Sequence, residues 1–269
     1  FEYLVRNNLL KHNVKFIFEG EEEIGSPSLA AFLEEHKELL KCDIILVSDT
    51  SMLGADLPSL TTGLRGLAYW QIEVTGANRD LHSGHFGGAV ANPINVLCKL
   101  IADVIDENGR ITIPHFYDDV EEVPAAEREM IAAIPFDEEA YKQGLGVEAL
   151  QGEKGYSTLE RNSCRPSFDV CGIWGGYTDE GAKTVIPSKA YAKVSTRLVP
   201  HQQHEKISQL FIDYIKDVAP RSVKVEVTPL HGGEGYVCPI TIPAYRAAED
   251  GFTQAFGKRP LAVRRGGSI

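Results

Sequence analysis

The alternation of apolar and polar positions predicts an α/β architecture over the first fifty residues. Apolar residues at helical spacing in 1–13 precede a short β-rich run at 14–18, and helical spacing returns at 29–40. A second, almost wholly apolar run at 44–47 has the composition of a strand that is buried on both faces of a sheet. Strand, helix and strand in this order predict a βαβ unit of a parallel sheet.

The middle of the chain follows a different order of elements. The pattern predicts two helices, at about 92–105 and 204–218. It also predicts four strands, at 67–74, 168–174, 190–198 and 223–227. The resulting order, strand–helix–strand–strand–helix–strand, is that of a ferredoxin-like domain. Residues 109–165 lack a strong period, and we interpret them as an insertion that packs on this domain.

The α/β pattern returns after this excursion, with a helix expected at 243–256 and a strand at 261–263. We therefore expect one domain with a mostly parallel sheet, formed by residues 1–63 and 232–269. A ferredoxin-like lid or dimerisation domain over 64–231 would interrupt it in sequence.

Composition and charge exclude several classes of binding partner. The 269 residues are 43% hydrophobic, which suits about two globular domains. A net charge of -11 argues against nucleic acid, because phosphate contacts require clustered lysine and arginine. No apolar run approaches the roughly 18 residues that span a bilayer, so no membrane partner is expected. Five scattered cysteines, never in a C-x-x-C pair, favour reduced thiols and a cytoplasmic location.

Carboxylates follow both predicted strands of the βαβ unit. Glu19, Glu21, Glu22 and Glu23 come directly after the first strand, at the end where open α/β sheets place their ligand sites. A solvated acidic loop is the simpler explanation for such a cluster. Asp49 ends the second strand and is alternatively a helix cap or turn residue. Carboxylates at two neighbouring strand ends favour a divalent metal.

Several motifs resemble those of the M20 metallopeptidase family, and in particular its carnosine-dipeptidase-like branch. The first two are Glu-Gly-Glu-Glu-Glu-Ile-Gly-Ser at 19–26 and Val-Ser-Asp at 47–49. Five more follow in the family's order: Gly-Leu-Arg-Gly at 63–66, Arg-Asp-Leu-His-Ser-Gly at 79–84, Lys-Thr-Val-Ile-Pro at 183–187, Ser-Thr-Arg-Leu-Val-Pro at 195–200 and Arg-Arg-Gly-Gly-Ser at 264–268. Together they span nearly the whole chain.

The resemblance implies a dinuclear metal site and a general base. Glu22 matches the base that takes a proton from a metal-bridging water, and Glu23 matches a ligand of one metal. Asp49 matches a ligand of the other metal. The implied cofactors are two divalent ions, zinc foremost, with manganese or cobalt as alternatives. Ions about 3.5–4 Å apart would lower the pKa of the water and polarise the scissile carbonyl.

The resemblance also assigns two residues of the lid. His82 matches a histidine that reaches across a homodimer and stabilises the tetrahedral oxyanion in the partner's site. A lone histidine outside such a motif is more often structural. Thr184 would add a hydroxyl contact to the partner subunit's substrate. His85, three residues after His82, has no family role that we can assign.

The remaining assignments concern substrate binding. Arg197 resembles the group that holds a peptide's C-terminal carboxylate, with a surface salt bridge as the alternative. His231 matches a substrate-binding histidine. Gly266, Gly267 and Ser268 form a glycine-rich turn whose backbone N–H groups can receive a carboxylate, although a tight turn alone also selects glycine.

Part of the family's metal site is missing from the chain. The pattern requires a His-x-Asp, a further Asp upstream and a late His, yet none of the eight histidines has an Asp two residues later. We expect these ligands outside the chain, which by itself would bind metal weakly and hydrolyse nothing. The expected function is that of a segment of a homodimeric peptidase acting on dipeptides or short peptides. The alternatives are an N-acyl-amino-acid deacylase of the same superfamily and a non-catalytic dimerisation module.

Overall fold

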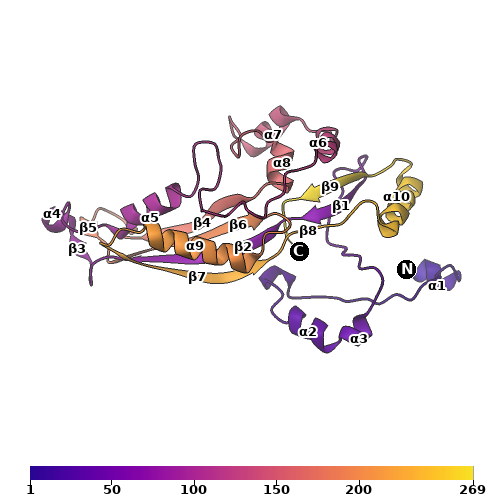
Figure 1. Cartoon of the computed structure of the whole chain (residues 1–269), viewed down its shortest axis with the longest axis horizontal. Coiled ribbons are helices and arrows are strands. Elements are labelled where there is room, and N and C mark those ends of the chain that lie inside the picture. The colour runs from indigo at the N-terminus through magenta and orange to yellow at the C-terminus, as the bar shows by residue number, and fades with distance from the viewer. Residues whose placement is uncertain (269) are drawn as a thin grey trace. The chain divides into compact units, whose positions relative to one another are not determined.

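The computed structural model describes residues 1–268, whose contacts divide them into two units, Phe1–Asp49 and Thr50–Ser268. A four-stranded sheet forms the centre of the second unit (Figure 1). Its strands lie in the order β4 (Ser167–Gly175), β6 (Lys189–Leu198), β2 (Gly66–Thr75) and β7 (Lys224–Gly233). Every pairing is antiparallel. Helices α5 (Pro93–Ala102) and α9 (His204–Val218) pack against one face of this sheet.

The period of each element explains this packing. Alternate residues of β2 are fully buried, namely Ala68, Trp70, Ile72 and Val74, and all four face the helices. In α9, the buried Ile207, Phe211 and Ile215 recur every four residues along one stripe. The Trp70 ring lies 4.5 Å from the Phe211 ring, and its indole N–H donates to Ser208 at 3.0 Å. The helices and strands expected for this region are confirmed to within three residues at each end, apart from β7, which continues to Gly233.

A second, three-stranded sheet joins distant parts of the chain. Its strands are β8 (Tyr236–Val237), β1 (Ser59–Leu64) and β9 (Leu261–Arg265), with β1 parallel to β9 and antiparallel to β8. Helix α10 (Pro243–Phe256) precedes β9 and ends at Gly257, whose φ of 67° suits glycine. The sequence pattern predicted α10 and β9 but missed β1.

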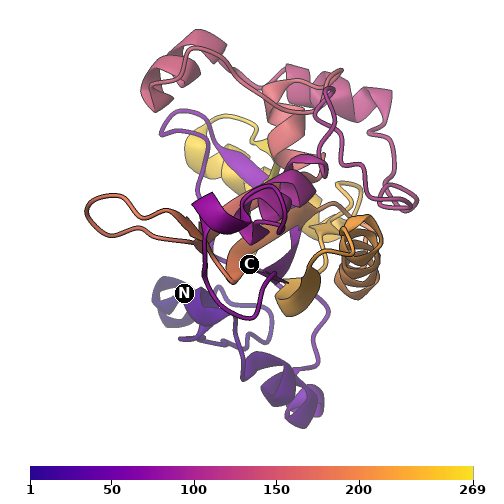
Figure 2. The ribbon, with the colours of Figure 1, turned by 90° about the vertical axis from the view of Figure 1, so that its left-hand side faces the viewer.

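Short elements complete the unit. Strands β3 (Leu81–His82) and β5 (Val185–Ile186) pair at one end of the four-stranded sheet, beside α4 (Ser83–Phe86), and β1 and β9 lie toward the other end (Figure 1). The loop between β4 and β5 projects from the body as an arm (Figure 2). The residues read as an insertion contain α6 (Ala125–Ala132), α7 (Glu138–Leu145) and α8 (Thr158–Ser163).

Ile111, Ile113 and Phe116 at the start of the insertion join the main hydrophobic core, and the rest of the insertion is held largely by polar contacts rather than by a periodic apolar stripe. The guanidinium of Arg165, with 1% of its side chain exposed, donates to both carboxylate oxygens of Glu153 at 2.8 Å. Arg128 donates to Glu160 at 2.5 Å, and Glu160 forms a capping box with Ser157 at the start of α8. These contacts explain why the hydrophobic pattern carried so little signal here.

The unit Phe1–Asp49 contains only short helices, namely α1 (Glu2–Arg6), the 3-10 helix η1 (Glu22–Ile24), α2 (Leu29–Glu35) and α3 (Lys37–Leu40). The helix expected at 29–40 is therefore interrupted at His36. The strands expected at 14–18 and 44–49 are wrong: both runs lack regular secondary structure and are exposed, and no described segment pairs with either. An apolar run becomes a strand only beside a hydrogen-bonding neighbour.

The mostly parallel sheet is likewise not found among residues 1–268, where the single parallel pairing is β1 with β9. Nor does this part of the chain contain a helix long and apolar enough to cross a membrane.

Candidate active site

His82 and Thr184, far apart in sequence, meet at the end of the four-stranded sheet. The pairing of β3 with β5 places His82 opposite Val185, so Thr184 lies beside the imidazole. The backbone N–H of Gly84 donates to His82 Nδ1 at 3.0 Å. Nδ1 is therefore an acceptor, and Nε2 carries the proton and donates to Thr184 Oγ1 at 3.0 Å. These two hydrogen bonds hold the ring in one tautomer and one orientation.

His85, for which the sequence indicated no role, packs on His82. The two imidazole rings have centroids 4.6 Å apart and planes inclined by 33°. Both side chains are exposed. His85 thus covers one side of the His82 ring.

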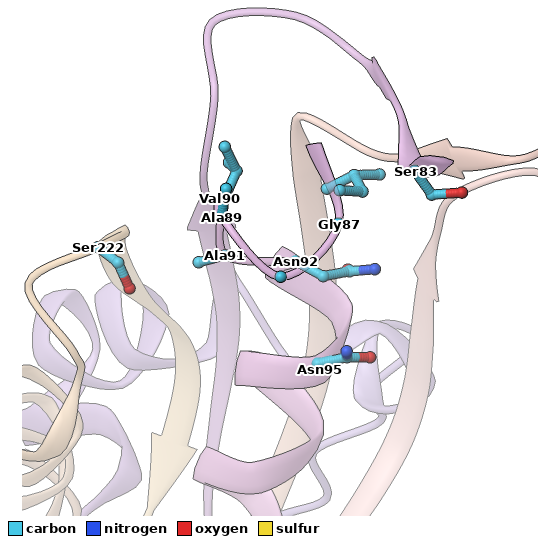
Figure 3. A pocket seen from close by; sticks show the side chains of 10 residues that line it. Ser83, Gly87, Ala89, Val90, Ala91, Asn92, Asn95 and Ser222 are labelled. Carbon is cyan, nitrogen blue, oxygen red and sulfur yellow. The ribbon is translucent and has the colours of Figure 1, made fainter. Parts of the chain in front are cut away.

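A pocket of about 530 Å³ opens at Ser83, the residue that follows His82 in the chain. Its walls are Ser83, the loop 87–91, the first turn of α5, Ile186 and Ser222. Figure 3 shows the amides of Asn92 and Asn95 on one side of α5, below that loop, with Ser83 at the rim. None of the lining residues titrates. The pocket therefore offers hydrogen bonds but no acid or base.

Arg197 and the glycine-rich turn meet at the opposite end of the same sheet. Arg197 is the penultimate residue of β6, and its Nη1 donates to Ser268 Oγ at 2.9 Å. Ser268 Oγ in turn donates to the backbone oxygen of Arg65 at 2.7 Å. The Arg65 guanidinium donates back to the backbone oxygen of Gly266 at 3.1 Å. Two parts of the predicted site, Arg197 and the turn, are thus joined directly. Gly267, also expected in this site, is exposed.

Close approach explains the glycine at 266. A Cβ there would lie 2.3 Å from the backbone oxygen of Asn162 and 2.7 Å from Arg65 Nη2. Neither Gly266 nor Gly267 has a positive φ. The tight-turn explanation for these glycines is therefore wrong for Gly266, where the crowding of the backbone excludes a side chain.

Arg65 is the residue that sequence reasoning missed. It lies in the Gly-Leu-Arg-Gly run but was assigned no role, because its partners are backbone oxygens far away in sequence. Burial, followed by the nearby charge of Arg197, lowers the pKa of the Arg65 guanidinium to about 10. The one signal available was an arginine directly before a glycine, at the junction of β1 and β2.

His231 lies on β7 and stacks on Tyr69 of the neighbouring strand β2. The ring centroids are 5.1 Å apart, with planes inclined by 20°. A hydrogen bond with Cys171, together with burial, raises the pKa of Tyr69 to about 12. The Cys171 sulfur also lies 3.4 Å from Ser195 Oγ, at a bulge of β4. Tyr69 and its neighbours thus form a supporting surface for the His231 imidazole.

Glu22, Glu23 and Asp49 belong to the smaller unit. Glu22 and Glu23 form the start of η1, which is closed by Gly25 at φ 86°. Glu22 is half-buried, whereas Glu23 and Asp49 are exposed. Throughout residues 1–268, no group of three or more histidine, cysteine, aspartate or glutamate side chains is arranged to hold a metal ion. Two carboxylates have suitable ligand atoms but do not complete a four-coordinate shell, so the described residues do not fit a whole metal site.

Comparison with known proteins adds an independent line of evidence. A family model described as the peptidase dimerisation domain, M20_dimer, matches residues 62–223. The chain is 33% identical over 262 residues to the Cys-Gly metallodipeptidase dug1 of Schizosaccharomyces pombe, covering 96% of this chain and 55% of that protein. It is 33% identical over 264 residues to the Beta-Ala-His dipeptidase of Homo sapiens, covering 96% of this chain and 52% of that protein.

Among solved structures, an M20 family metallo-carboxypeptidase, Sso-CP2 from Sulfolobus solfataricus, superposes with a TM-score of 0.90 at 30% identity. The match covers 99% of this chain and 60% of that one. The chain thus spans about half the length of the curated relatives it matches.

Proposed function

Because the chain belongs to the M20 family of metallopeptidases, we propose that the whole protein hydrolyses dipeptides or short peptides that end in a free carboxylate. The observation that carries this proposal is the contact of Arg197 with Ser268, which directs a guanidinium to the glycine-rich turn. A planar guanidinium binds a carboxylate through two parallel hydrogen bonds. The relatives named as dipeptidases and as a carboxypeptidase support a substrate of this class.

The domain arrangement that goes with this function has a lid and a catalytic domain. We assign residues 64–231 to a ferredoxin-like lid, and 1–63 with 232–269 to a discontinuous catalytic domain. The match of the dimerisation-domain family to residues 62–223 supports the first boundary. The order β2, α5, β4, β6, α9, β7 supports the lid's topology.

Within the catalytic domain, Glu22 is the proposed general base. A carboxylate there would accept a proton from the attacking water and pass it to the leaving amine. The metallodipeptidase relatives imply divalent metal ions. Zinc, a pair of ions, and ligation by Glu23 and Asp49 are our proposals. Since the described residues do not fit a whole metal site, we assign the other ligands to the rest of the protein, and the chain alone should be inactive.

The lid would bring two chains together as a homodimer. Strand β4 lies at the edge of its sheet and exposes Val170, Ile173 and Trp174. An exposed apolar edge strand is suited to pairing with another strand. In such a dimer, the Nε2–H of His82 would exchange its hydrogen bond to Thr184 for one to the oxyanion that forms in the partner's site, and the freed Thr184 hydroxyl would contact the substrate there. His231, held by Tyr69, would bind substrate at its own site.

We further propose a cytoplasmic location, where free thiols remain reduced. All five cysteines are free, and Cys42, Cys98 and Cys171 are exposed.

Steady-state assays of the whole protein test the function. We expect hydrolysis of dipeptides after divalent metal is supplied, and much slower hydrolysis of N-acyl amino acids, which share the carboxylate but lack the free amine. Glu22→Gln should remove turnover and keep the metal content, because it deletes the base and no ligand. Glu19→Gln, in the same exposed loop, is the matched control.

Three outcomes would contradict this proposal. Faster deacylation than peptide hydrolysis would favour the deacylase. A metal-loaded protein with neither activity would favour a dimerisation module. Loss of metal in Glu22→Gln would identify Glu22 as a ligand.

A further inference from the structure

We propose that Arg65 is a positioning residue of the subsite that binds the substrate carboxylate. Its guanidinium holds the glycine-rich turn in place, and its backbone oxygen orients the Arg197–Ser268 pair. This inference rests on the proposed function and deepens it. Arg65 itself does not have to touch the substrate.

The guanidinium of Arg65 connects three backbone oxygens from two distant segments. Its Nε donates to Gly266 at 3.1 Å, and its Nη1 donates to Arg165 at 3.0 Å and to Arg161 at 3.3 Å. Arg161 lies in the last turn of α8, where helix carbonyls lack partners within the helix. The planar guanidinium has five N–H donors and can satisfy acceptors that lie in several directions, which a lysine ammonium group cannot. The turn is thereby tied to the end of α8.

The backbone of Arg65 orients the other arginine. Its oxygen accepts the single hydroxyl proton of Ser268 at 2.7 Å, which leaves the Ser268 oxygen to accept from Arg197 Nη1 at 2.9 Å. In residues 1–268, Arg197 has no other hydrogen bond through its side chain. Its remaining N–H groups are therefore available to a ligand.

The charges around this pair favour an anion. Arg65 and Arg197 are close enough for their positive charges to repel, which contributes to the lowered pKa of Arg65. Asp169 attracts Arg65, but its Oδ2 accepts from Ser167 at 3.1 Å. No carboxylate in the described part of the chain forms an ion pair with either arginine. A substrate carboxylate would offset the repulsion, since an opposite charge stabilises the protonated form of each.

Gly266 offers an independent way to disturb the same contact. A Cβ at this position would lie 2.7 Å from Arg65 Nη2. The same Cβ would lie 2.3 Å from the backbone oxygen of Asn162, so Gly266→Ala shifts the turn away from both the guanidinium and that backbone without changing a charge.

The test compares a dipeptide with its C-terminal amide as substrates of the whole metal-loaded protein. Arg65→Lys keeps the charge but loses the fork, and Arg128→Lys is the matched control. Arg128 also donates to more than one acceptor, the carboxylate of Glu160 and the backbone oxygen of Gly155, but it does so within the insertion. For Arg65→Lys we expect kcat/KM for the free dipeptide to fall about tenfold or more through KM. The amide should be much less affected, and Arg128→Lys should keep the wild-type ratio of the two substrates.

A folded Arg65→Lys protein with the wild-type ratio would overturn the inference. If that variant does not fold, Gly266→Ala replaces it, with the same expectation and the same contradicting result.

Measurements of ligand binding distinguish a failure of this inference from a failure of the proposed function. Calorimetry with an amino acid and its amide needs no turnover, and Arg65→Lys should weaken binding of the free acid only. A protein that binds the acid in this way but hydrolyses no peptide would contradict the proposed function and support the role of Arg65. Equal binding of acid and amide by the wild type would overturn the subsite.

Discussion

The two units of the molecule contain similar apolar patterns but bury them very differently. In Thr50–Ser268, the alternate residues of β2 pack against two helices and are inaccessible to solvent. In Phe1–Asp49 no residue is buried, and Phe18 and Leu46 are 91% and 86% exposed. A hydrophobic pattern thus defines which face of an element can be buried, whereas burial itself requires an opposing surface.

The same contrast separates the candidate catalytic residues. In the larger unit, His82 and Arg197 are each held by a hydrogen bond to another residue expected in the site. In the smaller unit, neither Glu23 nor Asp49 is buried. We infer that substrate-binding groups are preorganised by the larger unit. The catalytic carboxylates would acquire their environment from the rest of the protein.

The largest expected effect is on stability, and it tests the difference in burial between the two units. Trp70→Ala should destabilise the 269-residue chain by about 3–5 kcal/mol, because it removes a fully buried ring and leaves a cavity. Phe18→Ala should change stability by less than about 0.5 kcal/mol. Chemical denaturation of the two variants measures both values. A large cost for Phe18→Ala in this chain would contradict the exposed environment, whereas a large cost only in the whole protein would show that the rest of the protein covers Phe18.

The next effect concerns the buried ion pair of the insertion. Glu153→Gln removes the partner of a buried guanidinium and should cost about 3 kcal/mol. Glu139→Gln, which removes a 73% exposed partner of Lys142, should cost less than about 1 kcal/mol. Denaturation curves again report both values. Equal costs for Glu153→Gln and Glu139→Gln would mean that Arg165 is not buried beside Glu153 as the structure shows.

A third prediction concerns catalysis at the end of the sheet. His82→Ala in the whole protein should lower kcat about 100-fold, the usual cost of losing one oxyanion donor. His85→Ala should have a smaller effect, because this ring only packs on His82. Mixing inactive Glu22→Gln subunits with the weakly active His82→Ala subunits should raise the activity above that of either variant if His82 acts across a dimer. No recovery in confirmed mixed dimers would contradict the role in trans.

The smallest effect is the pH dependence of a surface pair. A hydrogen bond from His204 lowers the pKa of Glu234 below its ordinary value of 4.5. A depressed carboxyl pKa stabilises the fold above the unfolded value, and this contribution is lost as the pH falls below about 4.5. Because the Glu234 side chain is 54% exposed, the loss should be under about 1 kcal/mol. Glu234→Gln should flatten acid unfolding in this range, and an unchanged pH profile would argue against the contact.

Local patterns predicted the elements of the four-stranded sheet and its helices well, because the partners of these elements lie in the chain. The helices 204–218 and 243–256 were expected at the residues where they occur. The runs at 14–18 and 44–49 had equally strong patterns, but no described strand lies beside them. The spacing of apolar residues in a segment does not show whether a neighbouring strand is present to pair with it.

The site shows the same limit. Family motifs identified Arg197 and Ser268, which the structure joins. Arg65 was overlooked although it lies in one of those motifs. Its bonds go to the backbone oxygens of Arg161, Arg165 and Gly266, and a backbone acceptor has no signature in the sequence.

Binding of a dipeptide to the Glu22→Gln whole protein tests the division of labour between the two units most directly. This variant should not turn the ligand over, so calorimetry can measure affinity alone. The account predicts that the free dipeptide binds at least about tenfold more tightly than its C-terminal amide. It also predicts that Arg197→Met in the same background abolishes that difference. Equal affinity for the two ligands, or a difference that survives Arg197→Met, would contradict it.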